Sequence, residues 1–203
     1  MSEEEILVLG SHFLGLLKYT GEKLGAEGRG NLLKSLDYED RAVFCKSADC
    51  SEAKKISMTE WYSYKAFKNF LNAVIKEIGK GDVNLARDIG HWGAEKDLDP
   101  KKGLLKFYTK DAYKGDRTVL HRATPVIWSQ AYNKGKIEVE TIEIGKETKL
   151  KLTGFPEVIE ACCLLIAGWI ERASQIVSGF NLRIEIKFKP TPDLDCEFTM
   201  FQD

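Results

Sequence analysis

Residues 136–154 read KIEVETIEIGKETKLKLTG, and this stretch decides the fold class. Apolar and charged side chains alternate on both sides of Gly145 and Lys146, which is typical of two β-strands joined by a short turn that contains glycine. The alternation returns in residues 181–188, NLRIEIKF, and in residues 196–201, CEFTMF. The sequence therefore predicts two antiparallel hairpins near the end of the chain.

A long apolar helix is predicted between the two hairpins. From Phe155 to Val177 the apolar residues recur at helical spacing, and Gly179 follows as a stop signal. The stripe consists of Ile159, Cys162, Cys163, Ile166, Trp169, Ile170, Ala173 and Ile176. We expect this segment to be the central helix of the fold.

Shorter helical patterns fill the first 134 residues. The first is predicted to end at Gly21, and others lie in residues 64–79, YKAFKNFLNAVIKEIG, and 82–98, DVNLARDIGHWGAEKDL. The predicted fold class is α+β: N-terminal helices, then an antiparallel four-stranded sheet with the long central helix between its two hairpin halves. We expect one domain over residues 1–203, mainly helical over 1–134 and strand-strand-helix-strand-strand over 135–203.

Charge and cysteine content narrow the functional classes. Thirty basic and 31 acidic residues leave a net charge of −1, so no overall field favours nucleic acid or an anionic membrane. The five cysteines show no spacing of a disulfide framework, which fits a reducing cytoplasm. The first residues, MSEEEILVLG, carry glutamates where a signal peptide carries basic residues. The longest uncharged run, residues 161–170, is about half a membrane span, so we expect a cytoplasmic protein without one.

No catalytic constellation is apparent in the sequence. GxSxG, HExxH, CxxC and a phosphate-binding loop are all absent, and GAEGRG at residues 25–30 lies between helices and follows no strand. The glutamates and lysines of residues 138–151 alternate as solvated cross-strand pairs do. We therefore expect a protein that is not an enzyme.

Two stretches carry a family resemblance. GFPEVIEACCLLIAGWIERA, residues 154–173, precedes an alternating strand and then DLDCEF, residues 193–198. This last third resembles the C-terminal half of the four-vinyl-reductase domain, a small-molecule-binding module of bacterial sensors with the fold of TRAPP tethering subunits. The N-terminal part, with ILVLGSHFLGLLKYTGEKLGAEGRGNLLKSL at residues 6–36, is similar to an uncharacterised bacterial family related to that domain. The whole layout is also similar to haem-nitric-oxide-binding domains, so the resemblance implies a TRAPP-like fold and ligand binding.

The resemblance also implies a test for zinc. Some four-vinyl-reductase sensors hold a structural zinc, and Cys162, Glu185, Phe188 and Cys196 fall at the spacing of its ligands. Phe188 replaces a cysteine there, and structural zinc is almost always four-coordinate. We expect no metal, with Cys162, Glu185 and Cys196 as degenerate zinc-like positions and the thiols buried as small apolar groups. The alternative is that Cys163 or water completes the site.

For haem, the resemblance implies a histidine on a helix and a Tyr-x-Ser-x-Arg motif for the propionates. His121, in VLHRATPVIW at residues 119–128, lies on the corresponding helix. The region of the motif reads ETKLKLTG, residues 147–154. We expect no haem and no other cofactor, and His121 is the ligand if haem binds.

An apolar ligand site is the functional hypothesis that remains. Aromatic and thiol side chains from three helices are expected to meet above the sheet, where the related folds have an apolar channel. These candidate ligand-binding residues are Trp92, Trp128, Tyr132, Cys163 and Trp169. We expect a non-catalytic small-molecule-binding or signal-sensing domain for an apolar or aromatic molecule. The alternative is a protein-interaction module whose core is filled, and a haem or zinc sensor comes after both.

Self-association is expected at the N-terminal helix. Phe13, Leu14, Leu16 and Leu17 present more apolar surface than one helical stripe can bury within a monomer. The sensors and tethering subunits that the chain resembles pair through helices. We therefore expect a homodimer with the N-terminal helices in its interface.

Overall fold

The computed structural model of the protein describes residues 5–47, 49–110, 113–116, 118–143, 146–188, 191 and 194–202, with the backbone alone at 120, 121 and 202. The chain divides into two compact units. Unit 1 comprises Met1–Leu85 and Gln130–Asn133, and unit 2 comprises Ala86–Ser129 and Lys134–Asp203. The expectation of one domain over residues 1–203 stays a prediction.

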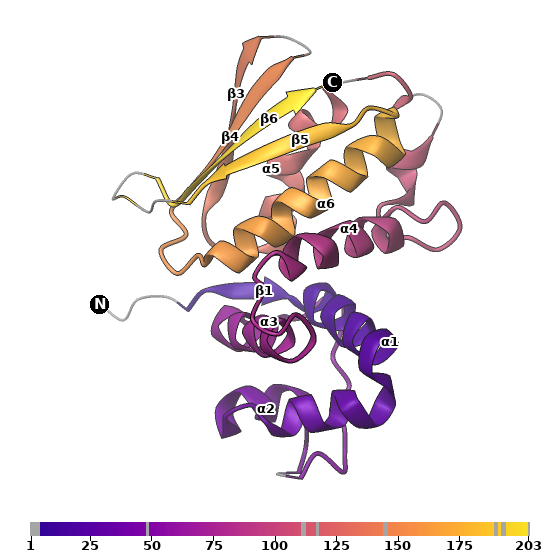
Figure 1. Ribbon diagram of the computed structural model, residues 1–203, viewed down its shortest axis with the longest axis vertical. Coiled ribbons are helices and arrows are strands. Elements are labelled where there is room, and N and C mark those ends of the chain that lie inside the picture. Colours follow the sequence, from indigo (N-terminus) through magenta and orange to yellow (C-terminus); the bar gives the residue numbers. More distant parts are fainter. Residues whose placement is uncertain are drawn as a thin grey trace. The chain divides into compact units, whose positions relative to one another are not determined.

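Unit 1 is helical and has an aromatic core. In chain order its elements are β1 (Leu7–Leu9), α1 (Gly10–Lys34), α2 (Tyr38–Phe44), β2 (Trp61–Ser63) and α3 (Tyr64–Ile78), as Figure 1 shows. β1 and β2 pair antiparallel, and strands of three residues are too short for a periodic signal in the sequence. The ring centroid of Phe13 lies 5.5 Å from those of Phe44 and Phe67, so aromatic contacts join α1, α2 and α3.

The predicted end of the first helix at Gly21 is wrong. α1 continues through Gly21 and is interrupted at Gly25, where φ is 71° and ψ is −179°. A single glycine inside a helix costs only about 1 kcal/mol relative to alanine, so it does not by itself end the helix. The left-handed φ at Gly25 is a conformation that glycine adopts without steric cost.

The loop after α2 contains a disulfide between Cys45 and Cys50. The expectation of no disulfide framework is wrong for this pair. A bridge between Cys45 and Ala53 folds the loop back on itself, which brings the two cysteines together. The intervening sequence is polar and lacks periodicity, so only the folded loop reveals the pairing.

The sheet of unit 2 confirms the predicted α+β fold class. β3 (Lys136–Glu143) and β4 (Glu147–Thr153) form one hairpin, and β5 (Leu182–Lys187) and β6 (Cys196–Gln202) form the other. All pairs are antiparallel, in the order β3-β4-β6-β5. Between the hairpins in sequence, α6 (Glu160–Ser178) runs along the sheet (Figure 1). None of the described helices combines the length and apolar character that crossing a membrane requires.

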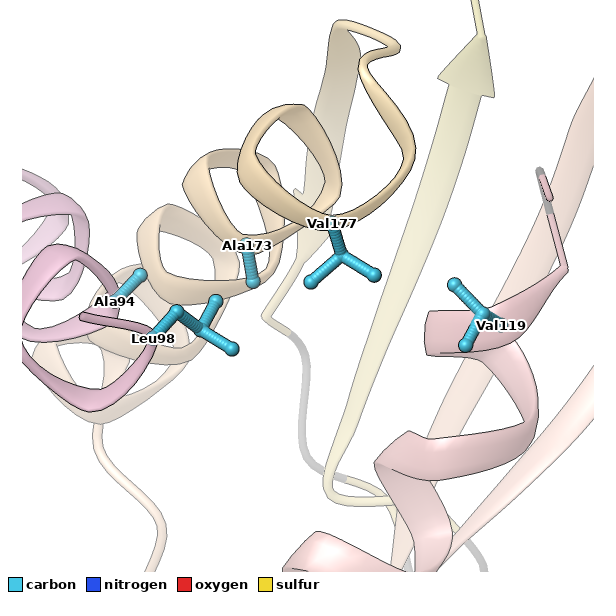
Figure 2. Close-up of a cluster of buried hydrophobic side chains, with 5 residues drawn as sticks. All are labelled: Ala94, Leu98, Val119, Ala173 and Val177. Carbon is cyan, nitrogen blue, oxygen red and sulfur yellow. The ribbon is translucent and has the colours of Figure 1, made fainter. Parts of the chain in front are cut away.

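Three helical elements precede this sheet: α4 (Leu85–Asp97), the 3-10 helix η1 (Lys106–Thr109) and α5 (Val119–Ala131). Their side chains meet those of α6 in a compact apolar cluster, shown in Figure 2. The cluster consists of Ala94, Leu98, Val119, Ala173 and Val177. Burial of these side chains stabilises the arrangement of α4, α5 and α6 within unit 2.

Two glycines allow α4 and α6 to touch. A Cβ atom on Gly90 would lie 2.1 Å from the carbonyl oxygen of Leu165, and one on Gly168 would lie 2.1 Å from that of Arg87. No side chain fits at either position. The contact brings the polar residues of α4 next to Glu171 on α6.

Candidate functional site

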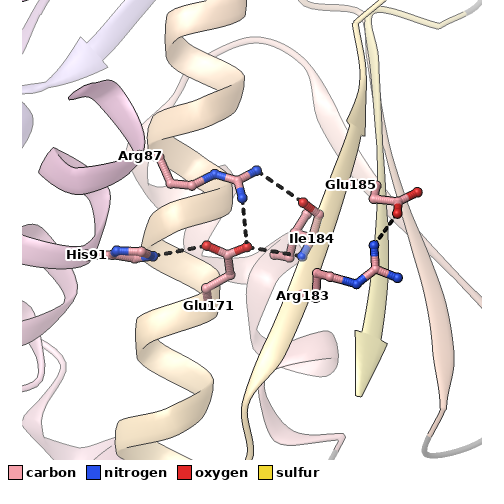
Figure 3. A network of polar contacts seen from close by, with 6 residues as sticks. All are labelled: Arg87, His91, Glu171, Arg183, Ile184 and Glu185. Carbon is pink, nitrogen blue, oxygen red and sulfur yellow. Dashed lines mark hydrogen bonds and ion pairs between the residues drawn. The ribbon is translucent and has the colours of Figure 1, made fainter. Parts of the chain in front are cut away.

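Glu171 on α6 is the centre of a polar network that joins α6 to α4 and β5. Arg87 Nη1 lies 3.2 Å from Glu171 Oε1, and His91 Nε2 lies 3.0 Å from Glu171 Oε2. The backbone N–H of Ile184 also donates to Glu171 Oε1, at 3.0 Å, and Arg87 Nη2 donates to the Ile184 carbonyl oxygen at 3.1 Å. Figure 3 shows these contacts converging on one carboxylate.

The network has the character of a structural ion-pair centre. The Glu171 side chain is 12% exposed, and both of its oxygens accept hydrogen bonds. Arg87 and His91 are both occupied by this carboxylate, although the Nε atom of Arg87 is buried without a hydrogen-bond partner in the described part of the chain. A carboxylate with hydrogen bonds on both oxygens holds the elements that carry its partners in place.

The candidate ligand-binding residues occupy several environments. Trp128 is buried, donates from Nε1 to the Lys134 carbonyl oxygen at 3.2 Å, and has its ring 5.3 Å from that of Phe155. Trp92 is half-buried, with Lys96 Nζ 5.2 Å from its ring centroid. Both residues belong to unit 2.

Trp169 and Tyr132 differ in their surroundings. Trp169 packs beside the apolar cluster of Figure 2 and donates from Nε1 to Asp97 Oδ2 at 2.9 Å. Burial raises the pKa of Asp97 above its usual range, and the indole N–H opposes that effect. Tyr132 belongs to unit 1, where its ring lies 5.3 Å from that of His12. The joint pocket of the five candidate residues therefore stays a prediction, with four of them in unit 2.

The three free thiols lie in the interior of unit 2. Cys162, Cys163 and Cys196 are all buried. A hydrogen bond to Cys196, together with burial, raises the pKa of Cys163 far above the range of free thiols. In this environment the Cys163 thiol is protonated at neutral pH, and a protonated thiol is a poor nucleophile.

Glu185 does not join these thiols, which corrects the zinc-like register. Along β5 the buried residues are Leu182 and Ile184, so Glu185 lies on the opposite face of the sheet and pairs with Arg183 there (Figure 3). Cys196 lies on the inner face, where it pairs with Leu152. In the residues that the structure describes, no group of three or more His, Cys, Asp and Glu side chains is placed to hold a metal ion.

Haem can be tested against the same residues. The segment at the position of the propionate motif forms β4, with Leu150 and Leu152 buried and Lys151 paired with Glu140 on the other face. The described arginines of unit 2 all pair with carboxylates: Arg87 with Glu171, Arg122 with Asp116, Arg172 with Glu95, and Arg183 with Glu185. His91 is bound to Glu171, and the His121 side chain lies outside the described residues. The described residues therefore do not fit the propionates of a haem.

The polar residues that organise the site were not among the predicted ones. Arg87 and His91 are separated by four positions on a helix, so they lie on one face, and Glu171 follows an apolar run directly. That spacing is the signal from which a paired network can be suspected. The sequence does not show that Glu171 is the partner of Arg87 and His91. The helices α4 and α6 are brought together by the contact at Gly90 and Gly168, which exists only in the folded chain.

Comparisons with known proteins show what the fold is similar to. No family model matches the chain, and no curated protein sequence matches it. Among solved structures, the Fe(II) unliganded H-NOX protein from K. algicida is 12% identical, with a TM-score of 0.62 and 96% of each chain covered. An H-NOX protein from S. oneidensis in the Fe(II)NO ligation state is 12% identical, with a TM-score of 0.60, and the match covers 96% of this chain and 99% of that one. At these identities the likeness shows the fold.

Proposed function

We propose that this chain is a non-catalytic domain that binds a small apolar or aromatic molecule and acts as a sensor of it. The observation that carries the proposal is the fold, which matches H-NOX proteins over 96% of this chain. The Glu171 carboxylate supports a role without catalysis, because both of its oxygens already accept hydrogen bonds from neighbouring groups. The relation to four-vinyl-reductase domains belongs to the same proposal.

The proposed ligand contacts are the four candidate residues of unit 2: Trp92, Trp128, Cys163 and Trp169. Aromatic walls with few polar atoms favour a planar organic ligand, because most of its surface is then removed from water. Cys163 is a neutral thiol with its pKa raised by Cys196 and by burial, which suits an uncharged ligand. A core filled by these side chains, and a role in protein interaction, is the competing proposal.

The experiment is a thermal-shift screen with aromatic acids, phenols, tetrapyrrole precursors and fatty acids. A ligand that binds only the folded chain at a hundred times its Kd adds about 2.7 kcal/mol of stability. For a chain of this size that is a rise in Tm of roughly 5 to 10 °C. Trp128→Ala should remove the rise for a true ligand, and the exposed Ile142→Ser variant should keep it. A screen without any shift, together with a filled core in a crystal structure, supports the interaction module instead.

Haem is the second candidate, because solved structures that share this fold are H-NOX proteins. The two structures above are of the unliganded Fe(II) and the Fe(II)NO states of those proteins. In this chain His121 on α5 is the proposed ligand, whereas the propionate partners do not fit. Haem added to the purified chain should give a Soret band that His121→Ala abolishes if this candidate is right. We expect no such band.

We also propose a homodimer, with fewer residues of α1 available for its interface than the sequence predicts. Phe13 and Leu16 are buried inside unit 1, so the argument from four apolar residues exposed on α1 is wrong for these two. Leu14 and Leu17 are half-buried and are the residues left for an interface. Nucleic acid plays no part in this proposal.

A further inference from the structure

The segment between α4 and α5 carries an apolar and basic surface that the proposed function does not use. Leu104 is 50% exposed and Phe107 is 47% exposed, and these two large apolar side chains lie three positions apart in one segment. Four exposed lysines surround them in the sequence: Lys101, Lys102, Lys106 and Lys110. We call these six residues the Leu104 surface.

The Leu104 surface is held by a rigid scaffold. The N–H groups of Gly103 and Leu105 donate to the carbonyl oxygens of Asp99 and Asp97, each at 2.8 Å. A Cβ atom on Gly103 would lie 2.3 Å from the Asp97 carbonyl oxygen, so glycine is required for this close approach. The segment therefore folds tightly against the end of α4.

Two side chains of the segment, three positions apart, point inward. Leu105 and Tyr108 pack against the apolar cluster of Figure 2, and the ring of Tyr108 lies 5.9 Å from that of Tyr113. The exposed ring of Phe107 rests on Tyr108, with 4.2 Å between centroids. Leu105 and Tyr108 thus anchor the segment, and Leu104 and Phe107 remain exposed to solvent.

The charge of this surface contrasts with that of the chain. Residues 99–110 contain four lysines and one aspartate, a local charge of +3 in a chain whose net charge is −1. The one aspartate, Asp99, accepts the N–H groups of Lys101 and Lys102, at 2.8 and 3.0 Å. Those two hydrogen bonds lower the pKa of Asp99, so this carboxylate stays ionised. The local charge of +3 is therefore that of four lysines and one negative carboxylate.

We infer that the Leu104 surface docks this domain on an anionic lipid bilayer, with Leu104 and Phe107 in the headgroup layer and the lysines on the lipid phosphates. Interfaces between proteins are depleted in lysine and favour arginine, whereas every basic residue of this surface is lysine. Lysines around exposed leucine and phenylalanine side chains are typical of segments that lie in a membrane interface. The occupant is therefore a lipid surface of negative charge.

The test is co-sedimentation of the full chain with vesicles of phosphatidylcholine alone and of phosphatidylcholine mixed equally with phosphatidylglycerol. Binding should require the anionic lipid and should weaken as salt is raised. Leu104→Asp and Phe107→Asp should each abolish it, and Lys106→Gln should weaken it about fivefold. Ile142→Asp is the matched control, because Ile142 is 49% exposed on β3, and it should bind as the unmodified chain does.

Insertion can be measured separately from charge. Phe107→Trp should bind as the unmodified chain does, and lipids brominated along their acyl chains should quench the added fluorescence. The inference is overturned if anionic vesicles bring down no protein at low salt, or if Phe107→Asp binds as well as the unmodified chain. The inference is also overturned if the chain does not bind vesicles and Phe107→Asp converts a dimer into monomers. The Leu104 surface is then an interface between two copies of the chain.

Discussion

At the scale of single residues, His12 links protonation to the folding of unit 1. Its ring lies 5.9 Å from that of Phe67 and 5.3 Å from that of Tyr132, both in edge-on contact. Burial lowers the pKa of His12 from 6.5 to about 4, and a backbone hydrogen bond to Leu9 opposes this effect. The imidazole is therefore neutral in the folded unit at pH values where the unfolded chain binds a proton.

The first prediction is that His12→Gln flattens the stability of the protein between pH 6.5 and 4. With the folded pKa below the unfolded one, stability is fully present above pH 6.5 and is lost as pH falls through about 4. The loss is at most about 3 kcal/mol, because one pKa unit is about 1.4 kcal/mol and a half-buried ring keeps some solvation. Urea unfolding of both proteins across this pH range measures it. Equal slopes in the two proteins would show that His12 does not titrate in this way.

At the scale of elements, the crossing of α4 and α6 decides what the polar groups of unit 2 can do. Gly90 and Gly168 bring the two backbones into contact, and Arg87 and His91 then reach Glu171 across the gap. The hydrogen bond from the Ile184 N–H to Glu171 extends the same contact to β5. Two helices and one strand therefore depend on one pair of glycines and one carboxylate.

The second prediction concerns the glycine contact. Gly168→Ala should destabilise the protein by about 3 kcal/mol, because the new Cβ atom meets the backbone of α4 and neither helix can yield without moving the other. Gly15→Ala is the control, since a Cβ atom there has nothing within 4 Å, and it should leave stability unchanged or raise it by up to about 1 kcal/mol. Chemical denaturation of both variants gives the comparison. A Gly168→Ala variant as stable as the Gly15→Ala variant contradicts the close contact.

The third prediction separates the buried carboxylate from an exposed one. Glu171→Ala should cost about 3 kcal/mol, because it leaves Arg87 and the Ile184 N–H without their acceptor in a partly buried place. Glu185→Ala removes a pair whose side chains are 59% and 61% exposed, so it should cost at most about 0.5 kcal/mol. Thermal unfolding of the two variants at low and high salt tests this. An equal loss of stability in the two variants would mean that burial does not determine how much each ion pair stabilises the protein.

At the scale of the whole molecule, the question is which residues a homodimer interface can use. Phe13 and Leu16 are already used in the core of unit 1, so any interface through α1 must use Leu14 and Leu17. A stable homodimer buries roughly 1,600 Å² or more of total surface, which is more than two half-buried leucines per copy supply, so neighbouring residues must take part.

The fourth prediction is that the chain is a dimer whose mass falls to that of a monomer in Leu14→Arg. A charged side chain at a buried interface without a partner disfavours association, while a half-buried position tolerates it in the monomer. Sedimentation velocity at tens of micromolar, as an order of magnitude for a stable interface, measures the mass. Circular dichroism should show the same helix content in both proteins. A monomeric unmodified chain rules the homodimer out.

Local pattern was sufficient for the elements of unit 2. Alternation in residues 136–154 indicates the two strands of the first hairpin, because side chains of a strand alternate between its two faces. The predicted turn residue Gly145 lies outside the described residues. The apolar stripe and Gly179 indicate α6, which ends at Ser178 with Gly179 in the left-handed region at φ 81°. Periodicity and the conformation of a single glycine are local features, so they can be predicted from the sequence.

The sequence by itself determined the fold class, the two hairpins, the central helix and the thiols as core residues. Only the tertiary structure decided that Cys45 pairs with Cys50 and that Glu171 meets Arg87 and His91. The physical reason is distance along the chain. Periodicity reports which face of its own element a residue occupies, whereas contacts between elements depend on how closely two backbones approach, which here is set by Gly90 and Gly168.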